Sequence, residues 1–299
     1  MARINFWLSK FSCTVLAIFC VFPVANAGNS VTLKLSFDEY STPHTTLLIN
    51  GYPVYVMIDT GSVMGFHLQE SQLKKIKGLK KERTYRSTDA AGKIQENIEY
   101  LADSLDVNGL KLRNVTVIPF KQWGLKLSDR GELPNGSVAG LGAFKDKLIM
   151  LDLVSHSLTM SDSLTNNTLA PKGFQEFPFH MSSDGMIFDV EQSGHKYHMI
   201  LDTGATVSTV WRERLKPYEP ASCLMVDPNM DNKGCEATML TTKSKSGNPE
   251  RFGAVVVAGN FKHMGNIDGL LGNNFLRNRK ILMDFKNKKI FISDEYRKE

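Results

Sequence analysis

The amino-acid sequence has no large excess of positive or negative charge, and it shows little helical periodicity. A formal net charge of +5 over 299 residues is too small to indicate a nucleic-acid partner. The scarcity of sustained helical periodicity favours an all-β fold, or a mostly β fold with short helices. With 42% apolar and 22% charged residues, nothing in the composition indicates disorder. A chain of this length can form one large or two moderate domains.

Residues 1–27 are predicted to be a signal peptide. They carry two basic residues and no acidic one, contain an apolar stretch over 11–24, and end with small residues at the two positions that a signal peptidase reads. An uncleaved anchor is the alternative, although the apolar stretch is too short to span a bilayer comfortably. Cleavage before Gly28 predicts a periplasmic or secreted protein with no stable membrane insertion afterwards.

Cysteine is scarce in the predicted mature chain, because Cys13 and Cys20 would leave with the signal peptide. Cys223 and Cys235 remain, twelve residues apart. In an oxidising compartment such a pair is predicted to form a loop-closing disulfide. A metal site is not expected there, since no nearby His or Cys completes a set of ligands. No cofactor is predicted either.

The strongest positive signal is the sequence Asp-Thr-Gly, which occurs twice. In both copies an apolar run ends abruptly at the aspartate, which predicts a buried strand that delivers a carboxylate to a turn. A hairpin-turn dipeptide precedes each strand, and an apolar-Gly segment follows each copy further along. The shared order of these features indicates an internal duplication. The two copies are Asp59, Thr60 and Gly61, and Asp202, Thr203 and Gly204.

This combination resembles the pepsin-like and retropepsin-like aspartic proteases over nearly all of residues 45–294. The resemblance implies two β-barrel-like lobes related by a pseudo-twofold axis, here 28–162 and 163–299, with a cleft between them. It implies that Asp59 and Asp202 are the catalytic pair of an aspartic endopeptidase, which activates a water between them to hydrolyse a peptide or protein substrate. One chain contains both halves, so a monomer is expected.

The resemblance also implies supporting roles for the residues that follow each aspartate. The hydroxyls of Thr60 and Thr203 would bond across to the backbone of the opposite lobe. Gly61 and Gly204 would present backbone N–H groups to the carboxylates.

The two copies differ at the next position, where Ser62 corresponds to Ala205. Ser62 is interpreted as a hydrogen-bond donor to Asp59 or, alternatively, as a turn residue only. A hydroxyl donor favours the charged carboxylate, and Ala205 offers Asp202 no such bond. The pair is therefore predicted to hold its shared proton to higher pH than a pair with two hydroxyl donors. The expected activity optimum is mildly acidic to near neutral.

A β-hairpin flap over the cleft is a further implication of the resemblance. The best candidate is 84–95, with a turn-prone tip near Asp89 and Gly92. Tyr85 is the candidate flap tyrosine, although the surrounding sequence does not match the family well. The alternative is that Tyr85 is a half-buried strand residue.

Other functions have weaker support in the sequence. A non-catalytic peptide- or protein-binding member of the same scaffold is the main alternative, because a fold does not fix a function. Loss of an aspartate or of its glycine would mark such a protein, and neither is lost here. His198 lies four residues before Asp202, but too few other ligands are in view for a metal site. A serine hydrolase is not indicated at 155–157, which lacks a glycine-flanked nucleophile turn.

Overall fold

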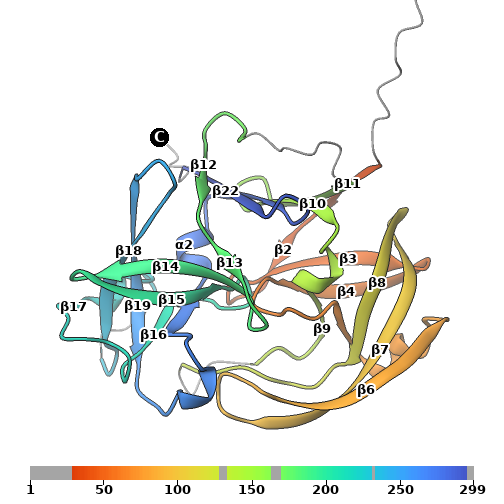
Figure 1. Ribbon diagram of the computed structural model, residues 1–299, viewed down its shortest axis with the longest axis horizontal. Helices are drawn as coiled ribbons and strands as arrows, with labels where there is room; N and C mark the ends of the chain where they lie inside the picture. The colour runs from red at the N-terminus through yellow and green to blue at the C-terminus, as the bar shows by residue number, and fades with distance from the viewer. Residues whose placement is uncertain (1–28, 128–132, 163–169, 231–232, 295–299) are drawn as a thin grey trace, which may run out of the picture.

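The computed structural model describes residues 29–127, 133–162, 170–230 and 233–294. The predicted signal peptide lies outside these residues. Strands dominate the described chain, and they form two eight-stranded sheets and one six-stranded sheet (Figure 1). The described helical segments are the single turns α1 (Glu70–Leu73) and α2 (Asn273–Leu276) and the 3₁₀ turns η1 (Leu141–Ala143), η2 (Cys223–Met225) and η3 (Lys262–Met264). The predicted mostly β fold with short helices is confirmed.

The first eight-stranded sheet comes from the N-terminal half of the chain. Its strands, in order across the sheet, are β2 (Ser36–Phe37), β3 (Pro43–Ile49), β4 (Tyr52–Asp59), β9 (Ser137–Gly140), β5 (Phe66–Leu68), β8 (Leu110–Pro119), β7 (Ile94–Val107) and β6 (Leu79–Thr88). The stretch 71–81 contains the end of α1 and the beginning of β6.

The second eight-stranded sheet comes from the C-terminal half and has the same plan. Its strands, in order, are β13 (His180–Met181), β14 (Met186–Gln192), β15 (His195–Leu201), β20 (Gly269–Leu271), β16 (Thr209–Trp211), β19 (Pro249–Val257), β18 (Ala237–Lys243) and β17 (Pro220–Ala221). Strand for strand, the directions of pairing agree: β4 runs parallel to β9 as β15 does to β20, and β5 runs parallel to β8 as β16 does to β19. The duplication seen in the sequence is thus a duplication of topology.

A six-stranded sheet joins the two halves, and it lies across the top of the view in Figure 1. Its strands, in order, are β1 (Ser30–Lys34), β11 (Ser157–Asp162), β10 (Lys147–Asp152), β21 (Lys280–Asp284), β22 (Lys289–Ser293) and β12 (Phe174–Phe177). The first three strands come from the predicted first lobe, 28–162, and the last three from the predicted second lobe, 163–299. Residues 163–169, at the junction of the two in sequence, lie outside the described residues. Because β10 pairs with β21, backbone hydrogen bonds connect the halves directly.

The hydrophobic core fixes which way the site residues point. In β4 the side chains of Val54, Val56 and Ile58 are buried in the main core. Successive side chains of a strand point to opposite faces of its sheet, so Met57 and Asp59 lie on the face away from that core. The alternation that buries an apolar stripe therefore also presents the Asp59 carboxylate at the end of the strand. No helix in the described part of the chain is long and apolar enough to cross a membrane.

Candidate active site

The two Asp-Thr-Gly turns meet where the halves of the molecule face each other. β4 ends at Asp59, and β15 ends one residue before Asp202. A Cβ atom on Gly61 would lie 2.5 Å from the Cγ atom of Asp202, and one on Gly204 would lie 3.1 Å from the Cγ atom of Asp59. Each carboxylate therefore packs against the glycine of the opposite turn. A side chain on Gly61 would therefore displace the Asp202 carboxylate, and one on Gly204 would press against that of Asp59.

A reciprocal set of buried hydrogen bonds fastens the turns to each other. The Thr60 hydroxyl donates to the carbonyl of Leu201 at 2.9 Å, and the Thr203 hydroxyl donates to the carbonyl of Ile58 at 2.6 Å. Each hydroxyl also accepts the backbone N–H of the other threonine at 3.0 Å. Both threonines are buried, so these four bonds are shielded from water and hold the two aspartates in a fixed relation.

Burial raises the pKa of both carboxyl groups, and their mutual contact couples them. Burial raises the pKa of Asp59 well above its usual range, and the neighbouring charge of Asp202 and the hydrogen bond with it raise that pKa further. Burial raises the pKa of Asp202 as well, although the hydrogen bond from Asp59 lowers it in part. Both carboxyl groups therefore hold a proton more readily than an exposed aspartate does.

Backbone N–H groups stabilise the ionised form at both aspartates. The N–H of Gly61 donates to Oδ1 of Asp59 at 2.8 Å, and the N–H of Gly204 donates to Oδ1 of Asp202 at 2.8 Å. The residue after each glycine contributes a second backbone N–H. The local surroundings of the two carboxylates are therefore nearly equivalent in backbone donors.

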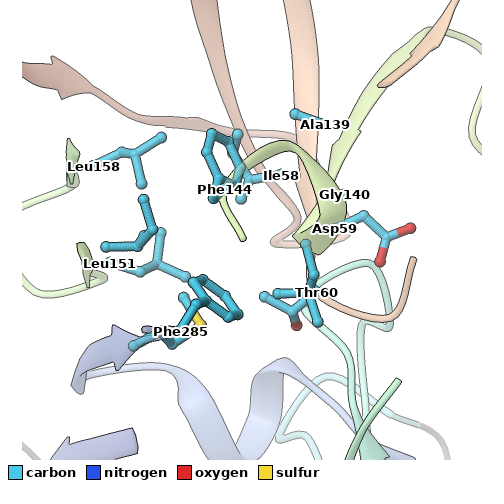
Figure 2. A pocket seen from close by; sticks show the side chains of 12 residues that line it. Ile58, Asp59, Thr60, Ala139, Gly140, Phe144, Leu151, Leu158 and Phe285 are labelled. Atoms are coloured by element: carbon cyan, nitrogen blue, oxygen red, sulfur yellow. The ribbon is translucent and has the colours of Figure 1, made fainter. Parts of the chain in front are cut away.

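An apolar layer lies behind the site. Figure 2 shows Phe144, Leu151 and Phe285 on one side of Asp59, whose carboxylate points away from them. The cavity among these residues has a volume of about 10 Å³, which is close to the minimum that a single water needs. The apolar layer supports the turn from behind, and the cavity within it is too small for a ligand.

The Ser62 side chain does not make the bond that the sequence predicts. Its Oγ atom lies 2.8 Å from Nε2 of His67, and within the described residues no hydrogen bond joins that hydroxyl to Asp59. A Cβ atom on Gly140 would lie 2.9 Å from Ser62 Oγ, so the hydroxyl is directed toward β9 and β5. The interpretation of the Ser62 hydroxyl as a donor to Asp59 is wrong, because Ser62 serves Asp59 through its backbone N–H.

His67 and Trp123 are neighbours of the site that the sequence analysis missed. His67 is buried in β5, and its ring lies 4.4 Å from the ring of Trp123. Burial lowers the pKa of His67 to about 4. The sequence could have drawn attention to His67, because a histidine is unusual between apolar residues in a short buried strand. Nothing in the sequence shows that it faces Ser62.

The predicted flap corresponds to the hairpin of β6 and β7, whose tip reaches the other half of the molecule. A Cβ atom on Gly92 would lie 3.5 Å from Cε1 of His263, in η3, and in Figure 1 the orange hairpin runs along the bottom of the view toward this blue segment. Asp89 stabilises the tip by accepting the backbone N–H of Lys93 at 2.8 Å. Tyr85 lies under the guanidinium of Arg83, 5.1 Å from its Cζ atom. No described contact joins Tyr85 to either aspartate.

The predicted disulfide between Cys223 and Cys235 is confirmed, with Cα atoms 6.3 Å apart. Cys223 packs in a small apolar cluster with Val207 and Val255. Val207 belongs to the segment that follows Asp202, so the disulfide-closed segment braces the second turn from outside.

His198, which the sequence offered as a weak metal-ligand candidate, pairs with Asp189. Nδ1 of His198 lies 3.0 Å from Oδ1 of Asp189. Within the described residues, no group of three or more His, Cys, Asp or Glu side chains is arranged to hold a metal ion.

Comparison with known proteins identifies the fold. No protein-family model matches the chain, and no curated protein matches its sequence. The structure of basic 7S globulin from soybean matches with a TM-score of 0.53 and 11% identity, covering 91% of this chain and 100% of that one. The structure of aspartic proteinase from Irpex lacteus matches with a TM-score of 0.53 and 13% identity, covering 89% of this chain and 98% of that one.

Identities this low show the fold and not the activity. One of these structures is named as a proteinase and the other as a globulin, so the chemistry has to be argued from the site. The chain has the two-lobed, mostly β fold found in an aspartic proteinase.

Proposed function

We propose that the protein is an aspartic endopeptidase that hydrolyses peptide bonds with a water activated between Asp59 and Asp202. The observation that carries the proposal is the pair of carboxyl groups, Asp59 buried and Asp202 partly buried, that meet at the junction of the two lobes with raised pKa values. Peptide hydrolysis without a covalent intermediate needs a base to take a proton from water and an acid to bond the substrate carbonyl. A carboxyl pair with one proton supplies both.

The roles of the two members follow from the site's hydrogen bonds. In the mechanism we propose, the ionised carboxylate accepts a proton from the water as the water attacks the carbonyl carbon. The protonated carboxyl donates a hydrogen bond to the carbonyl oxygen, where negative charge develops. Thr60, Thr203, Gly61 and Gly204 hold the two groups in the required relation and perform no proton transfer themselves.

The wider setting is also part of the proposal. We infer that the protein is exported to the periplasm or secreted, and that it acts as a monomer on peptide or protein substrates. The disulfide supports an oxidising compartment. The hairpin of β6 and β7 supports a flap that closes the site, because its tip lies beside η3 of the opposite lobe.

The test is digestion of a peptide library by the purified mature protein, with and without a pepstatin-type inhibitor. Wild type is expected to cleave, whereas Asp59→Asn and Asp202→Asn are expected to be inactive while folded. Asp103→Asn is a matched control, because Asp103 pairs with Lys80 at the surface. Full activity in either dyad variant contradicts the proposal. A wild-type protein that binds the inhibitor but cleaves no peptide favours a non-catalytic binding protein on this scaffold.

A further inference from the structure

His67 occupies the same face of its sheet as the carboxylate of Asp59. In the register of the sheet His67 lies opposite Val138, and Val138 lies beside Met57, two residues before Asp59. Residues opposite each other in a sheet share a face, and so do residues two apart in one strand. The imidazole is 8% exposed. A polar ring is therefore buried on the same face as the candidate catalytic group.

The contact of His67 with Ser62 is what connects this ring to Asp59. Nε2 of His67 lies 2.8 Å from Ser62 Oγ. The backbone N–H of Ser62 in turn stabilises the ionised Asp59 carboxylate. Fixing the Ser62 side chain therefore fixes the direction of a donor that acts on the carboxylate, and the buried imidazole would be costly to leave without this partner.

A second contact joins His67 to the flap hairpin. The Trp123 ring packs on His67 at 4.4 Å. The same short segment, 120–124, is bonded to the hairpin: the N–H of Gly124 donates to Oδ2 of Asp89 at 3.3 Å, and Nε2 of Gln95 donates to the carbonyl of Gln122 at 2.8 Å. Asp89 lies in the tip of the hairpin, so the tip and the Asp59 turn share one intervening segment.

The other lobe lacks this arrangement although its strands are equivalent. Thr209 lies opposite Leu270, which lies beside Ile200, two residues before Asp202. Thr209 therefore corresponds to His67, and Ala205 corresponds to Ser62. The buried hydroxyl of Thr209 has no hydrogen-bond partner among the described residues. The hydroxyl–imidazole contact is therefore present beside Asp59 and has no equivalent beside Asp202.

We propose that His67 is a positioning residue of the candidate catalytic pair, which orients Asp59 through Ser62 and links that turn to the flap hairpin through Trp123. This inference rests on the proposed function. Because burial lowers the pKa of His67 to about 4, the ring is uncharged in neutral and mildly acidic solution. A neutral ring holds Ser62 without adding a positive charge that would draw the shared proton away.

The first measurement needs no substrate, since it follows the carboxyl carbons of both aspartates by NMR as the pH is varied. In His67→Phe, which keeps a ring against Trp123 but cannot bond Ser62, the titration of Asp59 is expected to move to higher pH. Ser62→Ala should give a shift in the same direction, and the double variant should add little to either. His67→Gln, which retains a hydrogen-bonding group, should restore most of the wild-type titration. His198→Phe, in the other lobe, is the control.

The second measurement is peptide cleavage by the same variants. His67→Phe is expected to lower kcat by about tenfold or more while KM changes little, because a misplaced group costs rate rather than binding. An unchanged Asp59 titration in folded His67→Phe, additive shifts in the double variant, or an unchanged kcat would each overturn the inference. If wild type cleaves nothing while the titrations shift as expected, the proposed function fails and the link from His67 to Asp59 stands. His67→Gln and Ser62→Ala keep the test decisive if His67→Phe does not fold.

Discussion

Replacing Thr60 by Val should destabilise the protein far more than the loss of one surface hydroxyl would. The Thr60 hydroxyl donates to the carbonyl of Leu201 and accepts the N–H of Thr203, and Val removes both bonds while keeping the shape of the side chain. Each of these backbone groups would then be buried without a partner, which costs about 1–3 kcal/mol. For the two groups together, the free energy of unfolding should therefore fall by about 2–6 kcal/mol.

The chain offers a matched control in Thr209. This residue is as buried as Thr60, at 3% and 2% exposure, but in the part of the chain that the structure describes its hydroxyl has no hydrogen-bond partner. Thr209→Val should therefore be neutral or stabilising, because it removes an unsatisfied polar group. Urea unfolding followed by circular dichroism measures both variants. A Thr60→Val protein within about 0.5 kcal/mol of wild type, or an equal loss in Thr209→Val, would refute the reasoning.

Three further predictions concern the same turns and the disulfide. Gly61→Ala should abolish peptide cleavage, because the new methyl would lie 2.5 Å from Cγ of Asp202; a fully active variant would show that the turns do not meet as described. Asp59→Asn should stabilise the protein relative to wild type, and by more at pH 7 than at pH 4. Burial raises the pKa of Asp59 in the folded state, so wild type loses stability as the pH rises above the ordinary carboxyl pKa; thermal melts that show the opposite trend would contradict this. Replacing both Cys223 and Cys235 by Ser should lower the free energy of unfolding by about 3 kcal/mol, the value for a loop near this length. Urea unfolding measures the change, and an unchanged midpoint would show that the segment needs no cross-link.

The parts of the site that depend on short-range patterns could be predicted from the sequence. An apolar run that ends at Asp-Thr-Gly determines a strand, a turn and the face that the aspartate occupies, and all three are local properties. The tip of the flap hairpin follows in the same way from turn-prone residues near Asp89 and Gly92. Fold class follows as well, since two copies of one strand pattern favour two similar sheets.

The partner of Ser62 could not be predicted, because it depends on how the turn folds back on β5. Ser62 and His67 are five residues apart, and the sequence does not say whether the hydroxyl faces the aspartate or the strand. Trp123 belongs to a stretch with no periodic pattern, so its packing on His67 is set by tertiary structure alone. The joining of both halves in one six-stranded sheet depends on pairings between β10 and β21, more than a hundred residues apart.

The asymmetry at Ser62 bears on why the two aspartates need not be interchangeable. The duplicated framework gives both carboxylates the same kind of strand, glycine and backbone donors, and symmetry alone would let the shared proton lie on either. The turn of Asp59 is held by the part-buried contact between Ser62 and His67, and Ala205 stands in the place of that serine beside Asp202. The turn of Asp202 is held instead by Asn273, whose Nδ2 donates to the carbonyl of Thr203 at 2.8 Å, and by apolar packing of Val207 against Cys223. The two carboxylates therefore differ in the contacts that orient their turns, and this difference breaks the symmetry that the shared framework would otherwise give them.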